Sequence, residues 1–156
     1  TICLVGSEMC IRDSSWANLL SEKQYLEYSL KYIKKILKKL SEDPVTSKTP
    51  TIVFARDPKC NLNEFKLDDL SCYGMFTSVD PSSAIRVFEG SHALQGNLDP
   101  KILLEEDSVI KESALKMLSE FKDFPGYIFN LGHGITPDIN PDKVKVLVEA
   151  IRESGS

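Results

Sequence analysis

The sequence predicts an α/β protein in which parallel strands alternate with helices. Apolar residues recur at helical spacing over 21–42, 106–122 and 142–153. Short, continuous apolar runs lie between such segments, most clearly at 51–55 and 127–131. Such runs are typical of strands that are buried on both faces. Strict alternation of the two patterns predicts parallel β/α units. A doubly wound sheet and a part of a (β/α)8 barrel both fit this order.

The clearest helix is predicted over 21–42. Leu26, Leu30 and Ile33 begin an apolar stripe that Leu37 and Leu40 continue, and Ser21 followed by Gln24 forms a capping box. The other elements are expected in the order strand 51–55, helix 62–70, strand 73–76, helix 81–88, strand 92–97, helix 106–122, strand 127–131 and helix 142–153 with Pro141 at its first position.

Composition narrows the class of protein. The 156 residues carry a net charge of −4, which argues against a nucleic-acid partner, and the lysine-dense segment 31–39 has the spacing of a solvated helix face. No apolar run approaches the roughly 18 residues of a membrane span, and residues 1–14 do not resemble a signal peptide. The four scattered cysteines indicate a reducing compartment.

Three polar clusters follow predicted strands, at the edge where parallel β/α proteins place their reactive groups. They are Arg56-Asp57, residues 95–100 and residues 130–134. His133 lies between two glycines, so it either projects toward a ligand or is a loop histidine bonded to nearby backbone. His92 begins a predicted strand and is expected to be structural.

Several kinds of site are not supported by the sequence. Two histidines 41 positions apart and unpaired cysteines offer no zinc arrangement. The dinucleotide-binding GxGxxG pattern is incomplete and the GxSxG nucleophile elbow is absent. Asp99 and Asp138 stand beside prolines and are expected to form turns. We therefore predict neither a metal nor a cofactor.

The same clusters carry a family resemblance. Residues 94–100 resemble the LQGNLDP signature of uroporphyrinogen decarboxylases, and 129–138 resemble the family's NLGHGI-x-P-D motif. Residues 52–55 are similar to its VILFAK strand, and 15–20 to its DSWAGLL segment. These segments occur in the family's order over roughly residues 15 to 153 of the chain.

The resemblance implies the C-terminal part of a (β/α)8 barrel in a homodimeric, cofactor-independent enzyme. That enzyme converts uroporphyrinogen III to coproporphyrinogen III by removing four acetate carboxyls as CO₂. Of the family's substrate-binding residues, only Ser15 and His133 have counterparts here. The family's pyrrole-binding Asp, its Arg residues and its Tyr would lie upstream of residue 1, so no catalytic residue is assigned. The resemblance implies a cytoplasmic protein, with a plastid as the alternative.

The chain departs from the family's pattern at two places. The family's GLDW strand end reads Gly74-Met75-Phe76-Thr77, so its Asp and Trp are replaced. Residues 1–14 lack the family's strand and resemble a translated sequencing adaptor. We therefore expect 1–14 to be a non-native or divergent leader, and 15–156 to be the C-terminal portion of the barrel domain.

Two alternative functions stay open. The first is a cobamide-dependent methyltransferase of the same superfamily, although its His-x-Cys zinc ligands have no counterpart at His92 or His133. The second is a truncated chain without enzymatic activity that persists as a binding or dimerising fragment. Zinc content and release of CO₂ from uroporphyrinogen would discriminate between these alternatives and the decarboxylase.

Overall fold

A computed structural model describes residues 10–14 and 17–154. Its centre is a five-stranded, all-parallel sheet in the order β1-β2-β3-β4-β5. The strands are β1 (Cys10–Ser14), β2 (Thr51–Ala55), β3 (Cys72–Gly74), β4 (Ala93–Gln95) and β5 (Tyr127–Ile128).

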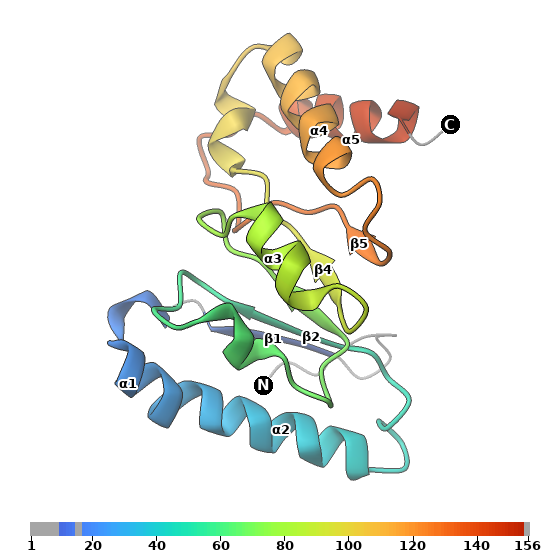
Figure 1. The fold of residues 1–156 in the computed structure, drawn as a ribbon. Helices are drawn as coiled ribbons and strands as arrows, with labels where there is room; N and C mark the ends of the chain where they lie inside the picture. Colours follow the sequence, from blue (N-terminus) through green and yellow to red (C-terminus); the bar gives the residue numbers. More distant parts are fainter. Residues whose placement is uncertain (1–9, 15–16, 155–156) are drawn as a thin grey trace.

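The strand order decides between the two folds that the sequence left open. In a doubly wound sheet the order reverses at a switch point, whereas strands of a (β/α)8 barrel follow one another around the ring. Here each strand pairs with the next one along the chain, without reversal. The ribbon accordingly shows a sheet with its helices arrayed along it (Figure 1). The arrangement is that of consecutive barrel units.

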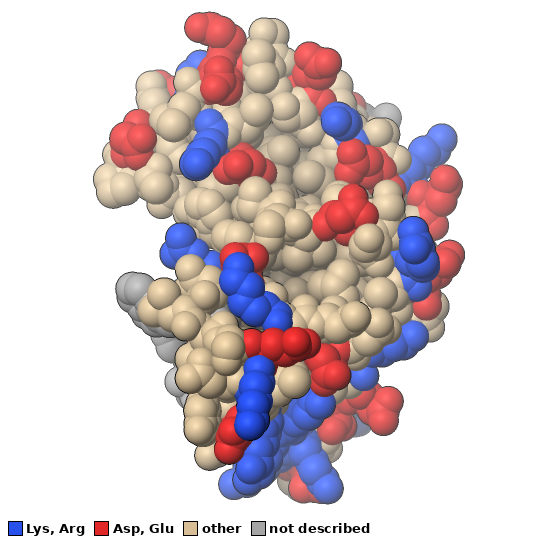
Figure 2. Space-filling model, turned by 60° about the vertical axis from the view of Figure 1, so that its left-hand side comes forward, with Lys and Arg blue, Asp and Glu red and all other residues tan. Residues whose placement is uncertain are grey.

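The first helical segment confirms the prediction for 21–42. It comprises α1 (Glu22–Tyr25), a π-helical turn (η2, Leu26–Leu30) and α2 (Lys31–Glu42). Ser21 and Gln24 form the capping box at its start. Ile33 and Leu37 are buried, while the lysines of α2 face outward and dominate the lower end of the molecule in Figure 2. The lysine-dense segment is therefore a solvated helix face.

Three of the remaining helical segments confirm predicted helices, one is shorter than predicted, and two short 3-10 segments were not predicted. They are η1 (Ala17–Leu19), η3 (Leu62–Phe65), α3 (Pro81–Phe88), η4 (Pro100–Leu104), α4 (Asp107–Glu120) and α5 (Pro141–Ser154). The helix expected over 62–70 is wrong, because only the single 3-10 turn η3 forms. Lys66 leaves helical geometry and Leu67 N–H turns back to the Phe65 carbonyl, while Phe65 and Leu70 still enter the core.

Two apolar clusters hold the structure together. The first lies between the sheet and the segment α1-η2-α2 with α3, and it is rich in aromatic rings. Tyr73 stacks on Phe88 at a centroid distance of 5.1 Å and meets Phe65 in a tilted contact at 4.7 Å. The second is mostly aliphatic and lies between η4, α4 and α5. No helix within the described part of the chain is long and apolar enough to cross a membrane.

Strand β1 is the element that the sequence did not indicate. Its residues pair in parallel with β2, from Cys10 opposite Thr51 to Ser14 opposite Ala55. The segment Cys-Ile-Arg-Asp-Ser has no apolar run, so its strand character comes from backbone pairing with β2 rather than from side-chain pattern. The hypothesis that residues 1–14 are not native protein stays a prediction.

Strands β3, β4 and β5 are shorter than expected, because the backbone turns out of the sheet soon after each begins. Only Leu98 and Leu131 extend the pairing beyond β4 and β5, through an isolated parallel bridge. Phe129 and Leu131, which made the sequence read as a longer strand, pack against the second apolar cluster. The turns after these strands therefore lie side by side at one edge of the sheet.

Candidate active site

The strand ends carry side chains on the face of the sheet opposite the helix-facing core. Val53 and Ala55 of β2 belong to the helix-facing core, and Phe54 between them points to the opposite face, as strand geometry requires. Phe54 lies over Gly74 of β3, where an added Cβ would come within 3.1 Å of the Phe54 Cβ. Gly74 thus leaves the space that the Phe54 ring needs.

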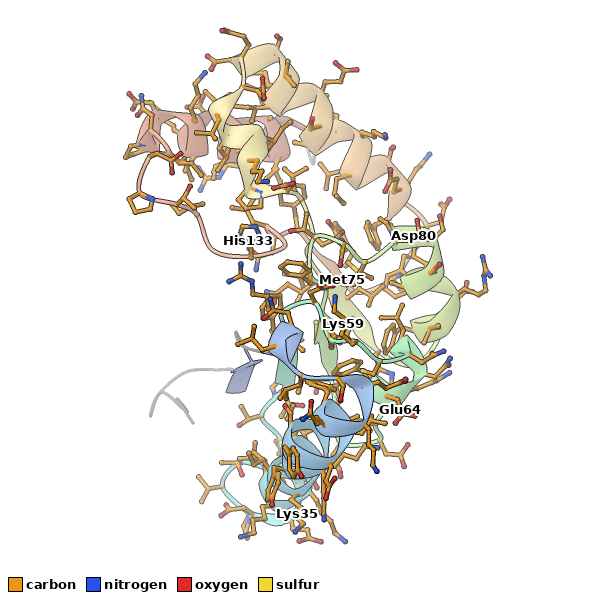
Figure 3. The ribbon with its side chains drawn as sticks, turned by 90° about the vertical axis from the view of Figure 1, so that its left-hand side faces the viewer. Lys35, Lys59, Glu64, Met75, Asp80 and His133 are labelled. Atoms are coloured by element: carbon orange, nitrogen blue, oxygen red, sulfur yellow. The ribbon has the colours of Figure 1, made fainter. Side chains whose placement is uncertain are left out.

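Three rings form a continuous strip along this edge, which we call the ring strip: Phe54, Phe76 and His133. Phe54 and Phe76 have their centroids 6.5 Å apart, and the His133 imidazole stacks on Phe76 at 5.7 Å with an interplanar angle of 27°. All three side chains are only half-buried. His133 projects at the middle of the molecule, on the side seen in Figure 3. The strip joins the ends of β2, β3 and β5.

A backbone hydrogen bond fixes the state of the His133 ring. Its Nδ1 lies 2.8 Å from the Gly134 carbonyl oxygen. Because a carbonyl only accepts, Nδ1 must carry the proton and donate. Nε2 forms no hydrogen bond with the residues that the structure describes. The half-exposed ring can therefore offer Nε2 to a ligand: as an acceptor when neutral, or as a donor when protonated.

The turn that carries His133 is held by close backbone packing. Gly132 lies so near Thr77 that an added Cβ would be 2.4 Å from Thr77 Oγ1 and 2.6 Å from Thr77 N. The Gly132 N–H donates to the Leu98 carbonyl at 2.8 Å. His133 can project only because its neighbour has no side chain.

The preceding turn is packed still more closely. Gly96 has φ of 119°, and its missing Cβ would be 2.8 Å from the Met75 carbonyl. The Asn97 side-chain amide donates to the carbonyls of Phe76 and Val79 at 2.9 and 2.8 Å. Tyr127 Oη donates to the Gly96 carbonyl. These contacts lock the ends of β3, β4 and β5 together beneath the ring strip.

The end of β2 carries a charged pair that behaves unequally. Asp57, in left-handed backbone conformation with φ of 43°, accepts from Lys59 Nζ at 2.8 Å and from Ser78 Oγ at 3.1 Å. The hydrogen bond from Lys59 is the main cause that lowers the pKa of Asp57, with Ser78 contributing. Arg56 is exposed and forms no ion pair among the described residues. Of these two residues, Arg56 is the one whose charge has no partner among the described residues.

Comparison with known proteins identifies the family. The family model described as uroporphyrinogen decarboxylase matches residues 5–154. The chain belongs to the uroporphyrinogen decarboxylase family. It is 40% identical over 148 residues to the uroporphyrinogen decarboxylase of Chlorobium chlorochromatii, covering 91% of this chain and 41% of that protein. With the uroporphyrinogen decarboxylase of Alcanivorax borkumensis it shares 35% identity over 139 residues, 89% of this chain and 39% of that protein.

The chain thus spans about two fifths of the length of the uroporphyrinogen decarboxylases it matches. Among solved structures, a methyltransferase from Methanosarcina mazei superposes with a TM-score of 0.72 over 97% of this chain and 43% of that one. The sequence identity is only 17%, so this likeness supports the fold alone. Family and fold agree with consecutive units of a (β/α)8 barrel.

The resemblance to the family predicts a substrate-binding role for two residues of this chain, His133 and Ser15, and this role stays a prediction. His133 lies in the ring strip, whereas Ser15 falls outside the described residues. Phe76 stands where the family's GLDW motif has its Asp, and its stacking on His133 was not predicted from the sequence. The signal was available, because Phe76 stands two residues after Gly74 and so on the same strand face as Phe54.

His92, Asp99 and Asp138 form structural hydrogen bonds. His92 Nε2 bonds to the Leu67 carbonyl at 2.8 Å, and its Nδ1 bonds to Ser91 Oγ. Asp99 caps η4 by accepting from the Lys101 N–H, so it is the turn former that was expected. A hydrogen bond from the Thr136 side chain lowers the pKa of Asp138, whose carboxylate is likewise engaged locally. The described residues contain no group of three His, Cys, Asp or Glu side chains suited to a metal.

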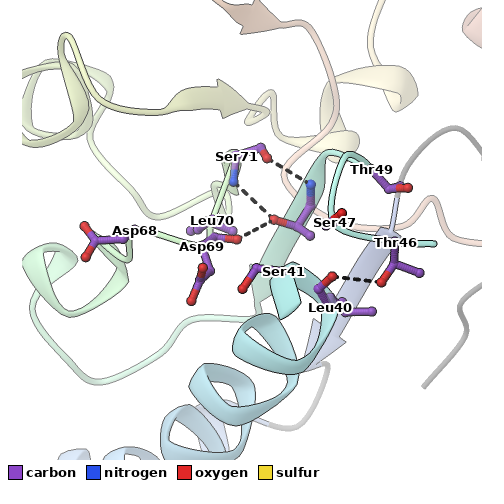
Figure 4. A pocket seen from close by; sticks show the side chains of 10 residues that line it. Leu40, Ser41, Thr46, Ser47, Thr49, Asp68, Asp69, Leu70 and Ser71 are labelled. Atoms are coloured by element: carbon purple, nitrogen blue, oxygen red, sulfur yellow. Dashed lines mark hydrogen bonds between the residues drawn. The ribbon is translucent and has the colours of Figure 1, made fainter. Parts of the chain in front are cut away.

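A polar pocket lies elsewhere, at the strands' N-terminal side. It is bordered by the end of α2, the turn after it and residues 68–71 (Figure 4). Its hydroxyl groups are largely committed: Thr51 Oγ1 donates to the Asp69 carbonyl, and Thr46 Oγ1 donates to the Leu40 carbonyl. This pocket ties the connection between α2 and β2 to the loop before β3, and it is separate from the ring strip.

Proposed function

We propose that this chain forms the C-terminal part of a uroporphyrinogen decarboxylase and supplies part of its substrate site. The observation that carries the proposal is the geometry of His133. Its ring is stacked on Phe76, its Nδ1 proton is committed to the Gly134 carbonyl, and its Nε2 is left for a ligand. A side chain fixed in this way can hold one arm of a substrate in a constant position.

The chemistry requires positioning more than a nucleophile. Each acetate arm loses its carboxyl group as CO₂, and a proton takes the place of that carboxyl on the arm's carbon. The electron pair left by the broken C–C bond is delocalised over the pyrrole until protonation. Protonated His133 would donate through Nε2 to a substrate carboxylate, while the neutral ring would accept from a pyrrole N–H. In either state His133 binds substrate and forms no covalent intermediate.

Ser15 is proposed as a second anchor through the family's DSW motif. A hydroxyl group can donate to a carboxylate or accept from a pyrrole N–H, so its chemistry suits both parts of the substrate. The family's pyrrole-binding aspartate has no counterpart assigned in this chain. We therefore propose that residues 1–156 bind substrate groups but do not turn over alone.

Anaerobic incubation with uroporphyrinogen III tests the proposal. Residues 1–156 would be assayed alone and together with the N-terminal part of the Chlorobium chlorochromatii relative that this chain does not match. We expect coproporphyrinogen only from the combination, and a large loss of it with His133→Ala. Turnover by residues 1–156 alone would refute the claim that essential groups are missing. Full turnover by the combination carrying His133→Ala would refute the role of His133.

The methyltransferase alternative has no specific support in the site. Its likeness to this chain is one of fold, and the described residues offer no three-ligand zinc arrangement. Stoichiometric zinc in the purified protein would reverse this preference. The fragment alternative is addressed by the incubation above, since a chain that binds no porphyrin and restores no turnover would be a non-enzymatic fragment.

Homodimerisation and a cytoplasmic location are also proposed, both on the family resemblance. Sedimentation of the combined protein would establish its oligomeric state, and a monomer at micromolar concentration would refute the dimer. Imaging of the tagged full-length protein in its source cells would separate the cytoplasm from a plastid.

A further inference from the structure

We propose that Arg56 is a carboxylate-binding residue at the opposite end of the ring strip from His133. The proposal rests on the proposed function and deepens it, because it adds a second cationic anchor for the same class of substrate. It concerns a residue outside the two that the family resemblance brought forward.

Strand geometry places Arg56 on the ring-strip face. It directly follows the last residue of β2 and stands two positions after Phe54. Because side chains two residues apart in a strand share a face, Arg56 is placed on the face that carries Phe54. The Phe54 ring contacts Phe76, and Phe76 stacks on His133. With Arg56 beside Phe54, the edge would present a guanidinium group, two phenyl rings and an imidazole in that order.

The guanidinium group is available for a ligand. Arg56 is exposed and has no ion-pair partner within the described part of the chain. The adjacent carboxylate, on Asp57, is occupied by Lys59 and Ser78. A free guanidinium presents a planar fork of donors that matches the two oxygens of a carboxylate. In this structure the Arg56 guanidinium does not form an ion pair with the adjacent Asp57 carboxylate.

The order of groups along the strip defines the class of ligand. Two cationic or donor groups are separated by aromatic surface, so a matching ligand carries carboxylates on separate arms of a ring system. Pyrrole rings would contact Phe54 and Phe76, while one arm meets Arg56 and another meets His133. A tetrapyrrole with acidic arms on different rings has this pattern.

Titration with uroporphyrin, the oxidised and fluorescent form of the substrate, tests Arg56 directly. Residues 1–156 would be compared with Arg56→Gln, Arg56→Lys and the control Lys35→Gln. Lys35 is exposed and lies far from His133 (Figure 3), and its Nζ is 5.5 Å from the centroid of the Tyr32 ring. Its loss changes the net charge by the same amount without touching the strip.

We expect Arg56→Gln to weaken uroporphyrin binding roughly tenfold, the size of one charge-assisted hydrogen-bonded pair. Arg56→Lys should retain part of the affinity, and Lys35→Gln should stay within about twofold, because distant surface charges are screened. Unchanged far-UV circular dichroism would establish that the variants are folded. Equal losses for Arg56→Gln and Lys35→Gln, no loss for Arg56→Gln, or no binding by the parent chain would each overturn the proposal.

The outcomes separate this inference from the decarboxylase itself. If the combined protein converts uroporphyrinogen and depends on His133 but not on Arg56, the function stands and the Arg56 anchor fails. If uroporphyrin binding depends on Arg56 while the combination never releases CO₂, the anchor stands and the decarboxylase proposal fails.

Discussion

The two turns that follow β4 and β5 are built in opposite ways. The turn at 95–98 is enclosed: Gly96 and Asn97 are buried, and the Asn97 side chain donates to the backbone after β3. The turn at 131–134 is packed on one side only, where Gly132 meets Thr77, while Gly134 is exposed with nothing near its Cβ position. Both turns match motifs of one family, yet the first holds the scaffold and the second presents a side chain.

Gly96→Ala, in the enclosed turn, should reduce the free energy of unfolding more than any other substitution considered below. The new Cβ meets the Met75 carbonyl at 2.8 Å, and φ of 119° is strained for any residue with a side chain. Adding backbone strain to overpacking, we expect a loss of about 4 kcal/mol in the free energy of unfolding. Urea unfolding measures it, and a loss below about 1 kcal/mol would show that the turn is not enclosed.

Gly132→Ala and Gly134→Ala test the two sides of the second turn. The Cβ at 132 would overlap Thr77 Oγ1 and N, so a loss of about 3 kcal/mol is expected. The Cβ at 134 meets nothing within 4 Å, so that variant should lose less than about 0.5 kcal/mol. Equal unfolding midpoints for the two variants would contradict the one-sided packing.

Asn97→Ala should cost about 2 kcal/mol. It removes the only side-chain donors that the structure gives to the carbonyls of Phe76 and Val79, within a buried turn. Asn63→Ala is a suitable control, because Asn63 is exposed and its side chain donates to nearby Asn61. If the two variants melt at the same temperature, Asn97 is not a scaffold residue.

Phe76→Leu should give the smallest effect on stability, about 1 kcal/mol, because an apolar side chain is kept and only ring contacts are lost. The affinity for uroporphyrin should nevertheless fall, because the His133 ring would no longer be held by its stack on Phe76. A variant with unchanged affinity would mean that the ring strip does not position the histidine.

The sequence predicted the helices better than the strands, for a physical reason. The segment 21–42 has both an apolar stripe and a capping box, and Pro81 and Pro141 mark helix starts, so local signals agree with packing. Strand length depends on partners distant in sequence. Phe129 continues an apolar run but packs against the α4-α5 core, and β1 has no apolar pattern at all.

The site could be predicted only in part. A histidine between two glycines after a strand pointed to His133, whose ring stacks on Phe76 and bonds to the adjacent Gly134 carbonyl. Its role in binding a ligand stays a prediction. Its stacking partner could not be found by motif comparison, because Phe76 is where this chain departs from the family pattern. In the sequence, Arg56 and Asp57 were predicted together as one polar cluster. The structure distinguishes them, because Asp57 is hydrogen-bonded to Lys59 and Ser78.

The stack of His133 on Phe76 also has a spectroscopic consequence. The chain contains two histidines, so a proton NMR spectrum holds two sets of imidazole signals. An imidazole lying face to face with a phenyl ring is shielded by the ring current, so the signals of His133 carry an upfield shift that a free loop histidine lacks. The same contact that orients the residue thus makes it an intrinsic reporter of whatever displaces or covers the ring.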